Sequence, residues 1–447
     1  METIKLGVLG TGSFARAFIP LFKAHPGVST VALADRLPDR LAAEAAIAGL
    51  TETYPSFEAL LASDCDAIAI FTPRHTHAPF AVAALRAGKH VYSAVPVGVD
   101  ATEIAQIEAT VRETGLTYML GETSYYYPST ILCRELWRQG RFGRFVYGEG
   151  EYMHDMGHGF YEAYQYSGGP DWKRVAGVPP MFYPTHTASM ITSVTGARLT
   201  HVCCFGQVDR HDDGIFRKGA NEWDNEFSNE TALFRTSDGG SARLNEFRRI
   251  GHFGGRSVRL SIFGTSGCFE EQPGGEVFVN HDLEVYPLTD LLRCAPLTEQ
   301  DRRKASRPDG TQEDFYSGMA AVHPTWRLPK EFDGLDNGHH GSHQFLVDDF
   351  VRACLTGDLP PNHIWAAARY NLPGLVAHAS ALQNGAILPI PDLGDAPTGA
   401  RLLEQELARL APAGSTWSLP APSQRGSKHW MKSGVSGATS DGYSTRP

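Results

Sequence analysis

The chain has 447 residues, of which 42% are hydrophobic, 20% are charged and 10% are aromatic. This is the composition of an ordinary globular protein, and the length suggests two domains with sizeable cores. With 40 Lys and Arg against 50 Asp and Glu, the formal net charge is −10. No basic tract marks a surface for nucleic acid or acidic membranes, so we set these partners aside.

The first residues lack the basic start, apolar core and cleavage site of an export signal, and no apolar run of about 18 residues could span a bilayer. Seven cysteines are scattered without C-x-x-C spacing. This pattern argues against structural disulfides and against a zinc knot. We expect a protein of the reducing cytoplasm.

Short apolar runs alternate with helical patterns through the first third of the chain. The predicted strands are Ile4–Gly10, Val28–Asp35, Ala67–Thr72, His90–Val95 and Tyr118–Glu122. The predicted helices between them are Phe14–Ala24, Leu41–Ala48, Phe57–Ala62, Pro79–Ala87 and Thr102–Thr114. Such alternation is typical of α/β folds, with a parallel sheet covered by helices on both faces.

The rhythm changes after about residue 125, where a predicted helix at Thr130–Gln139 leads into longer strands. These strands are Phe145–Met153, Thr200–Gln207, Glu230–Thr236, Ser241–Arg249 and Ser257–Gly264. Strands that follow one another without helices indicate a mostly antiparallel sheet in an α+β domain. Further helices are predicted at Gln344–Leu355 and His363–Asn384.

A glycine turn, Gly10-Thr-Gly12-Ser13-Phe14-Ala15, joins the first predicted strand to a helix. Glycine at 10 permits the tight turn, glycine at 12 lets a backbone approach a pyrophosphate, and Ala15 allows the helix to pack closely on the strand. The helix N-terminus adds amide donors for the phosphates. We predict a dinucleotide site that includes Gly10, Gly12, Ser13 and Phe14, and a purely structural turn is the alternative.

Asp35 ends the second predicted strand, roughly 20 residues beyond the glycine turn. A carboxylate at this place accepts a hydrogen bond from a ribose 2′-hydroxyl and repels a 2′-phosphate. NAD is therefore predicted in preference to NADP. The neighbouring Arg36 leaves an alternative open, because its guanidinium could bind that phosphate or stack on the adenine.

Two further segments complete a recognisable pattern: Thr72-Pro-Arg-His-Thr-His77 follows a later strand, and Ala87-Gly-Lys-His-Val91 leads into the next. Together with the glycine turn and Asp35, they resemble the Gfo/Idh/MocA family of glucose-fructose oxidoreductases and inositol dehydrogenases, over about residues 1 to 392. The resemblance implies an NAD-binding Rossmann domain and an open, largely antiparallel substrate sheet. It implies cofactor contacts from Thr72, Pro73, His75, His77, Pro96 and Glu122.

Two positions depart from the ordinary dehydrogenases of that family. Where these enzymes carry Glu-Lys-Pro, with a lysine that assists hydride transfer, this chain has Ala94-Val95-Pro96. Where they carry an aspartate four residues before a catalytic histidine, this chain has Phe182 before His186. The usual lysine and aspartate are both replaced.

Tyr152-Met-His154 and Tyr183-Pro-Thr-His186 stand in this region. Both pairs look like the active site of the family's NAD-dependent glycoside hydrolases, such as α-N-acetylgalactosaminidases and sulfoquinovosidases. The resemblance implies that Tyr152, His154, Tyr183 and His186 are catalytic. It also implies a redox-neutral hydrolysis: NAD⁺ oxidises the sugar's C3 hydroxyl, the aglycone is eliminated across C1 and C2, water adds, and NADH returns the hydride.

The residue types suit this chemistry. Histidine, with an ordinary pKa of about 6.5, can act as acid or base near neutral pH. Tyrosine, with a pKa of about 10, is a poor free base, but a neighbouring cation can lower its pKa and its hydroxyl can polarise a ketone. Our hypothesis makes His186 the base at the C3 hydroxyl and Tyr183 the base at C2, with Tyr152 and His154 around the leaving group.

Other interpretations stay open. Tyr152 and His154 share one face of a strand and could form a hydrogen-bonded core pair. His154 with His158, and His339 with His343, have the i, i+4 spacing of a metal pair, but glycine inside both motifs argues against a clean helix, and we expect no metal. A sugar or inositol dehydrogenase with net oxidation is the rival function, and a non-catalytic NAD-binding protein is a third.

Lys173 and Arg174 follow a Gly-Gly-Pro-Asp-Trp172 loop that is close in sequence to the catalytic residues. Guanidinium and ammonium groups donate well to carboxylates and sulfonates. Trp172, Lys173 and Arg174 are therefore predicted to bind substrate, with a sulfoquinovoside as the most specific candidate. Solvated surface charges are the plainer alternative.

The predicted fold is an N-terminal Rossmann parallel sheet followed by an α+β domain built on an open, mostly antiparallel sheet. We expect an NAD-binding domain at residues 1–125 and a substrate domain at 126–392. Residues 393–447 would be a C-terminal extension, largely weakly ordered, because residues 412–447 are rich in Ser, Gly and Pro. Family analogy adds a small-molecule glycoside as partner and a homo-oligomer.

Overall fold

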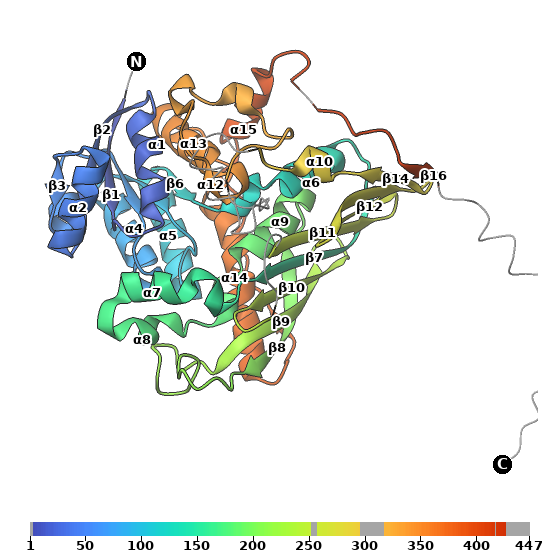
Figure 1. Cartoon of the computed structure of the whole chain (residues 1–447), viewed down its shortest axis with the longest axis horizontal. Helices are drawn as coiled ribbons and strands as arrows, with labels where there is room; N and C mark the ends of the chain where they lie inside the picture. Colours follow the sequence, from blue (N-terminus) through green and yellow to red (C-terminus); the bar gives the residue numbers. More distant parts are fainter. Residues whose placement is uncertain (1–2, 252–256, 296–316, 416, 426–447) are drawn as a thin grey trace, which may run out of the picture.

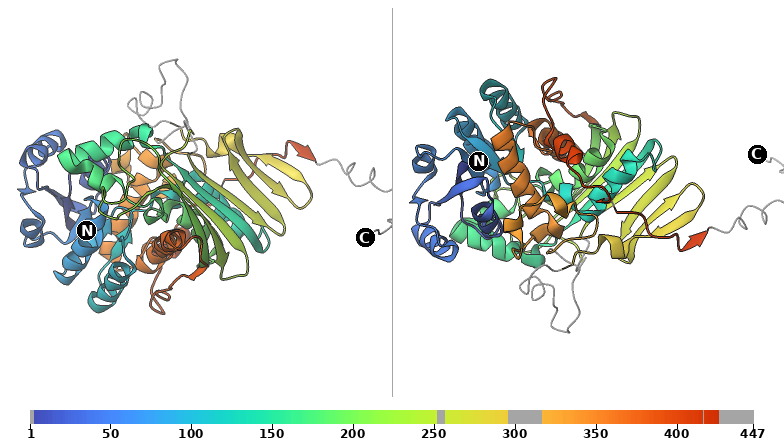
Figure 2. Two further views of the ribbon diagram at one scale, coloured as in Figure 1. Left: turned by 90° about the horizontal axis from the view of Figure 1, so that it is seen from below. Right: turned by 90° about the horizontal axis from the view of Figure 1, so that it is seen from above.

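The computed structural model describes residues 3–251, 257–295, 317–415 and 417–425, and the structure below is that of these residues (Figure 1). Two sheets dominate it. The first lies in the N-terminal quarter of the chain, and the second occupies the opposite end of the molecule (Figures 1 and 2).

The first sheet has six described strands, all parallel, in the order β3-β2-β1-β4-β5-β6. This is the predicted Rossmann arrangement. Its strands are β1 Ile4–Leu9, β2 Val28–Ala34, β3 Thr53–Tyr54, β4 Ala67–Ile70, β5 His90–Ser93 and β6 Tyr118–Leu120. Its helices are η1 Ala15–Ala17, α1 Ile19–Ala24, α2 Pro38–Ala48, α3 Phe57–Leu61, η2 Arg74–Thr76, α4 His77–Arg86 and α5 Ala101–Thr114.

The helix predicted at residues 14–24 is divided into a short 3-10 turn and α1. Pro20 stands in the first turn of α1. Because proline lacks an amide hydrogen, it is favoured where a helix begins and disfavoured in a helix interior. The glycine turn is therefore followed by a tight turn before the regular helix starts.

The second sheet has ten described strands in the order β15-β8-β9-β10-β7-β11-β12-β13-β14-β16. Neighbouring strands are antiparallel except β10 and β7, which are parallel, so the predicted mostly antiparallel sheet is confirmed. Its strands are β7 Phe145–Met153, β8 Leu199–Val208, β9 Phe227–Thr236, β10 Ser241–Phe247, β11 Val258–Gly264, β12 Gly267–Gln272, β13 Gly275–Asn280, β14 Glu284–Pro287, β15 Leu388–Pro389 and β16 Gln424–Arg425.

The remaining helices pack on the second sheet or between the two sheets (Figure 1). They are η3 Thr123–Tyr126, α6 Pro128–Arg138, η4 Met156–Phe160, α7 Tyr161–Gly168, η5 Gly169–Asp171, α8 Trp172–Ala176, η6 Pro180–Phe182, α9 Thr185–Thr195, α10 Thr289–Leu292, η7 Thr325–Arg327, η8 Lys330–Phe332, α12 Gly338–Gly341, α13 His343–Thr356, α14 Ile364–Leu382 and α15 Leu403–Arg409. Helix α13 packs with the Rossmann core, since Phe345 and Phe350 share a buried cluster with Leu6 and Val8 of β1.

The C-terminal segment is partly described. Leu403 and Leu407 of α15 are buried together with Ala353 of α13, and β16 pairs with β14 at the end of the second sheet. Residues 426–447 lie outside the described residues, so weak order in the extension stays a prediction. Within the described ranges, every helix is too short or too polar to cross a bilayer.

Small residues let α9 approach β7 closely. A Cβ atom added at Gly150 would lie 2.7 Å from the backbone oxygen of Thr187, and one at Gly148 would lie 3.3 Å from the Ile191 side chain. The backbone at Thr187 has little freedom to move away, because α9 is also packed against β11 and α14. This close approach places the first turn of α9 beside the end of β7.

Gly150→Ala should therefore destabilise the protein by about 1 to 3 kcal/mol through overpacking, and should impair any activity that needs α9 beside β7. Thermal unfolding of the purified variant measures the stability effect. Gly274→Ala is the matched control, because a Cβ there meets nothing within 4 Å. Equal melting temperatures for the two variants would contradict this account of the packing.

Candidate active site

The glycine turn has the shape that a dinucleotide requires. Gly10 has a φ of +86°, and a Cβ there would lie 2.7 Å from the carbonyl oxygen of Phe71. A Cβ at Gly12, in contrast, would meet nothing within 4 Å, which leaves room for a pyrophosphate to approach the backbone. Ser13 is exposed and Phe14 is half-buried. The residues present therefore fit the predicted cofactor.

Asp35 lies just beyond the end of β2 and is buried. Its carboxylate accepts hydrogen bonds from the amide and hydroxyl of Thr11, both at 2.9 Å, and from Nε and Nη2 of Arg40, both at 3.1 Å. Burial acts to raise the pKa of Asp35, but the hydrogen bonds from Arg40 and Thr11 hold it below its usual value. The arginine beside this carboxylate is thus Arg40, whereas the predicted Arg36 is exposed.

The segment Thr72–His77 forms the loop and turn after β4. Thr72 and Thr76 hydroxyls lie 2.6 Å apart. His77 is buried, with Nδ1 2.8 Å from the carbonyl oxygen of Pro96 and Nε2 2.8 Å from that of Thr72. His77 therefore fixes the loop to the segment after β5. Thr72, Pro73 and His75 are exposed or half-buried, and the cofactor contacts of all four residues stay predictions.

The four residues predicted to be catalytic lie together, although they come from β7, the segment after it, the residues before α9 and α9 itself. The Tyr152 ring centroid is 5.3 Å from that of His186, 5.6 Å from His154 and 5.7 Å from Tyr183. The Tyr183 and His186 centroids are 5.1 Å apart. We call Tyr152, His154, Tyr183 and His186 the Tyr-His cluster.

Glu122, predicted as a cofactor contact, holds His186 in this structure, and its contact with a cofactor stays a prediction. Its Oε1 is 2.5 Å from Nδ1 of His186, and it also accepts hydrogen bonds from the Ser124 hydroxyl at 2.6 Å and amide at 2.9 Å. Both partners are buried. Burial acts to raise the pKa of Glu122, but the charge and hydrogen bond of His186 hold it below the usual range, so Glu122 is a carboxylate that orients the imidazole.

Val95 and Phe182, which replace the lysine and aspartate of the dehydrogenases, both pack against apolar or aromatic neighbours. Val95 is buried in the apolar core after β5, and the Phe182 ring packs edge-on against His378 at 5.2 Å. Neither side chain can transfer a proton. The carboxylate missing at residue 182 is supplied to His186 from the end of β6 by Glu122.

Two guanidinium groups approach Tyr183. The Arg74 guanidinium carbon lies 4.6 Å from the ring centroid of Tyr183, and that of Arg248 lies 6.0 Å away and 4.8 Å from the Tyr152 centroid. Burial raises the pKa of Tyr183 to about 12, although both guanidinium charges act to lower it. The resting side chain is therefore a phenol. Arg74 carries no assignment from sequence, although it lies inside the Thr72–His77 segment.

His339 lies near the two histidines of the Tyr-His cluster, whose charges act on its pKa. The His154 ring stacks on Phe160 at 4.0 Å. Both His339 and His340 have left-handed backbones, with φ of 47° and 53°, which is strained for residues other than glycine. His339 lies 5.4 Å from the Phe14 ring, and burial, with the nearby charges of His343 and His186, lowers its pKa well below the ordinary value. No group of three metal-ligating side chains is found among the described residues.

Helix α7 joins the second domain to the Rossmann domain (Figure 2). The Tyr164 hydroxyl bonds to Nη1 of Arg74. The Tyr166 hydroxyl accepts a hydrogen bond of 3.1 Å from Arg16, and its ring lies 5.5 Å from the guanidinium carbon of Arg40. Because Arg40 also holds Asp35, α7 is anchored at both the Asp35 end and the Tyr183 end of the cofactor site. We call α7 the strap.

The predicted substrate residues Trp172, Lys173 and Arg174 belong to α8, beyond the strap. Lys173 and Arg174 are exposed, and Nζ of Lys173 donates to the Asp213 carbonyl at 2.9 Å. The Trp172 ring packs edge-on against Tyr161 at 6.0 Å. The structure does not bring these three residues into contact with the Tyr-His cluster, and their role in binding stays a prediction.

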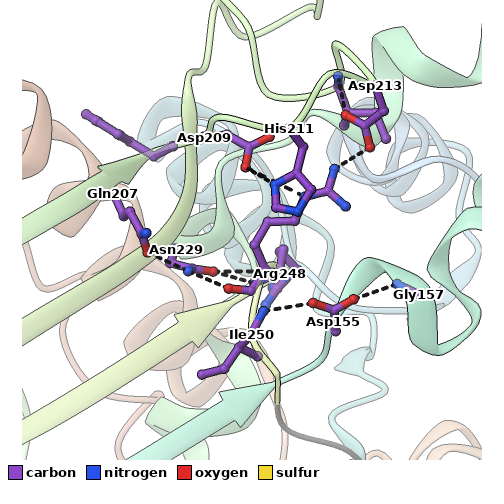
Figure 3. A network of polar contacts seen from close by, with 12 residues as sticks. Asp155, Gly157, Gln207, Asp209, His211, Asp213, Asn229, Arg248 and Ile250 are labelled. Carbon is purple, nitrogen blue, oxygen red and sulfur yellow. Dashed lines mark hydrogen bonds and ion pairs between the residues drawn. The ribbon is translucent and has the colours of Figure 1, made fainter.

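A polar network fixes the backbone that carries Arg248 (Figure 3). The Asn229 Oδ1 accepts from the amides of Arg248 and Arg249, both at 2.9 Å. Asp155 caps the turn after β7 at the Gly157 amide, 2.8 Å away, and accepts from the Ile250 amide at 2.7 Å. Arg248 is therefore held in a defined position relative to the residues that follow β7.

Glu246 lies opposite both Glu230 and Tyr152 on neighbouring strands. It is fully buried, accepts a hydrogen bond of 2.9 Å from the Thr187 hydroxyl, and lies 3.1 Å from Nη2 of Arg248. Burial raises the pKa of Glu246 to about 8 despite the opposing effect of Arg248. At neutral pH the carboxyl group is therefore mostly protonated.

This shift predicts a pH dependence of stability. Between the unfolded pKa of 4.5 and the folded value of about 8, the folded state binds a proton that the unfolded state has lost, so this group makes the protein less stable as the pH rises through that window. Glu246→Gln should remove this contribution, so its melting temperature should fall less than that of the wild type between pH 5 and pH 9. Parallel slopes for the two proteins would contradict a protonated Glu246.

Comparison with known proteins agrees with this geometry. The family model for the oxidoreductase family with an NAD-binding Rossmann fold (GFO_IDH_MocA) matches residues 4–122. A glycosyl hydrolase family 109 protein from Saccharopolyspora erythraea is 31% identical over 412 residues, covering 88% of this chain and 83% of the relative. One from Streptomyces niveus is 25% identical over 416 residues, covering 88% and 77%.

Among solved structures, scyllo-inositol dehydrogenase from Lactobacillus casei with bound NAD(H) and scyllo-inositol matches with a TM-score of 0.63 at 18% identity, over 87% of this chain and 99% of that chain. At this identity the match supports the fold alone. The family is shown by the Saccharopolyspora erythraea relative, which is 31% identical over 88% of this chain. The chain belongs to glycosyl hydrolase family 109, a family of NAD-dependent glycosidases within the Gfo/Idh/MocA oxidoreductases.

Proposed function

We propose that the protein hydrolyses glycosides without net oxidation, through transient oxidation of the sugar's C3 hydroxyl, elimination of the aglycone across C1 and C2, addition of water and re-reduction. The Tyr-His cluster beside the dinucleotide turn carries this proposal. The replacement of the dehydrogenase lysine and aspartate by Val95 and Phe182 disfavours a net sugar dehydrogenase, the rival on the same fold.

The cofactor site supports this reading. NAD would be held by the glycine turn at its pyrophosphate, by Asp35 at a ribose hydroxyl, and by Thr72, Pro73 and His75 toward the nicotinamide. When bound, it supplies a hydride acceptor that can return the hydride. Ligands of such folds bind at the carboxyl ends of the parallel strands, and Arg74 after β4 and Glu122 after β6 both face the Tyr-His cluster from that edge.

His186 is proposed to take the proton of the C3 hydroxyl. With Nδ1 donating to the Glu122 carboxylate, Nε2 is the basic nitrogen that would face the sugar. Tyr183 is proposed to exchange the C2 proton. Because its resting form is a phenol, it would first release its own proton to solvent, with the guanidinium charges of Arg74 and Arg248 stabilising the resulting phenolate, and the phenolate would then take the C2 proton. Tyr152 and His154 would then assist the departing aglycone.

The proposed substrate is an anionic sugar glycoside, with a sulfoquinovoside as the most specific candidate. A panel of nitrophenyl glycosides, neutral and acidic, tests the function. Release of phenol with catalytic NAD and no accumulation of NADH supports a redox-neutral hydrolase. NADH formed in proportion to product would instead establish the net dehydrogenase.

We also propose that the protein works in the cytoplasm and as a homo-oligomer. In the described residues the cysteines are thiols rather than disulfides, as a reducing compartment favours. The sheet face opposite α9 exposes Phe205 and Leu233, at 65% and 53%. A second copy covering this face would bury both side chains, and light scattering of the purified protein measures the assembly.

Asp35→Ala should shift the cofactor preference from NAD toward NADP by about 10- to 100-fold, because the ribose acceptor is lost and Arg40 is released to meet a 2′-phosphate. Dissociation constants of both dinucleotides, measured by calorimetry, give this ratio. Asp39→Ala is the matched control, because Asp39 is an exposed carboxylate in the first turn of α2. An unchanged ratio in Asp35→Ala would remove the ribose assignment.

Tyr183→Phe should reduce turnover by about 100-fold or more while NAD still binds, because the ring is kept and the transferable proton is lost. Steady-state hydrolysis of the best nitrophenyl glycoside measures turnover, and calorimetry measures NAD affinity. Tyr147→Phe, on the opposite face of the sheet, where its hydroxyl bonds to Glu149, should retain activity. Full activity of Tyr183→Phe would refute its role.

A further inference from the structure

Arg74 and Arg248 bring two positive charges to the Tyr-His cluster. Arg74 is half-buried at the start of η2, and its guanidinium carbon lies 4.6 Å from the Tyr183 ring centroid. In the described part of the chain it forms no ion pair; it donates to the Tyr164 hydroxyl and its guanidinium lies over the Tyr183 ring. A guanidinium removed from water without an anionic partner is costly.

Arg248 is 4% exposed, and its guanidinium lies over the rings of Tyr152 and Phe160. The carboxyl group closest to it belongs to Glu246, at 3.1 Å. Because burial raises the pKa of Glu246 to about 8, this partner carries little charge at neutral pH. The positive charge of Arg248 is therefore only weakly compensated inside the protein.

Other cations near the site are neutralised by the protein itself. Arg249 pairs with Asp213 and bonds to the Tyr161 hydroxyl at 2.6 Å. Arg243 lies 2.9 Å from Glu151 on the outer face of the sheet. Among the described residues near Tyr152 and Tyr183, the positive charges without an equal negative partner are thus those of Arg74 and Arg248.

We propose that Arg74 and Arg248 together bind an anionic group of the sugar, a carboxylate or a sulfonate, and make the enzyme selective for acidic glycosides. This inference rests on the proposed glycosidase function and moves the anion site from Lys173 and Arg174 to the two arginines beside Tyr183. Guanidinium donors suit both anions, because each presents several oxygens to paired N–H groups. The anion would supply the counter-charge that the protein lacks there.

The position of Arg74 and Arg248 beside Tyr152 and Tyr183 would also affect substrate specificity. A substituent held by Arg74 and Arg248 is fixed against Tyr152 and Tyr183, so its binding would orient the ring carbons next to the proton-transferring groups. A neutral sugar would leave the Arg74 guanidinium without an ion-pair partner and that of Arg248 with Glu246 alone, which penalises its binding. Discrimination therefore arises from both the attraction of the right substrate and the cost of the wrong one.

Three nitrophenyl glycosides that share one sugar configuration and differ at C6 test this proposal: a hydroxymethyl, a carboxylate and a sulfonate. The wild type should favour at least one acidic substrate over the neutral one in kcat/KM. Arg74→Met should lower this acidic-to-neutral ratio by about 100-fold, and Arg74→Lys should lower it less, because the charge is kept and the paired donors are lost. The carboxylate and sulfonate arms distinguish the two anions.

Arg174→Met is the comparison variant, since it removes the same guanidinium from the exposed position in α8. Its acidic-to-neutral ratio should equal that of the wild type. A loss of selectivity in Arg174→Met but not in Arg74→Met would overturn the proposal. So would equal losses on neutral and acidic substrates in Arg74→Met, or a fall in NAD affinity that accounts for the whole effect.

Calorimetric binding of the free acidic and neutral sugars to the NAD-loaded protein separates this inference from the glycosidase function. Tighter binding of an acidic sugar that is lost in Arg74→Met, and in Arg248→Met where that variant folds, would support the anion site even if every glycoside resisted hydrolysis. Hydrolysis of glycosides with equal binding of acidic and neutral sugars would retain the function and refute the anion site.

Discussion

The buried pair of Glu122 and His186 is the interaction on which the site depends. It joins the segment after the last Rossmann strand to the first turn of α9, at 2.5 Å, and so ties the Rossmann domain to the domain of the second sheet at the proposed site of the reaction. Glycines 148 and 150 bring α9 against β7, which sets Tyr152 beside His186. The position of the Tyr-His cluster follows from these two constraints.

Much of the fold could be predicted because hydrophobic periodicity reports burial directly. β7 has the predicted bounds, and the strands around it and the helices α13 and α14 differ from expectation by a few residues. The strands β12 to β14 were not predicted. Most of their residues are half-buried, and several are Glu or Gly, so the alternation that marks a strand with one buried face is weak there.

The candidate site could be predicted where it consists of short motifs, as in the glycine turn and the two Tyr/His pairs, which the structure brings together. It was not predictable where partners are distant in sequence. Glu122 meets His186 across 64 residues, and Arg74 meets Tyr183 only because the two domains face each other. The contact between Arg40 and Asp35 was not predicted for a related reason. Arg36 is the neighbour of Asp35 in sequence, but the first turn of α2 places Arg40 against the Asp35 carboxylate.

The strap gives the enzyme a particular vulnerability. Tyr164 and Tyr166 fasten it to Arg74, Arg16 and Arg40, so a dinucleotide seated beneath it would exchange with solution only when those contacts open. In the proposed redox-neutral reaction, which returns the hydride to the sugar in every cycle, slow exchange of the cofactor would carry no penalty. If an oxidised sugar dissociated before re-reduction, however, the enzyme would retain NADH and could not begin another cycle. The rate at which α7 opens would then set the rate at which NADH is replaced by NAD⁺.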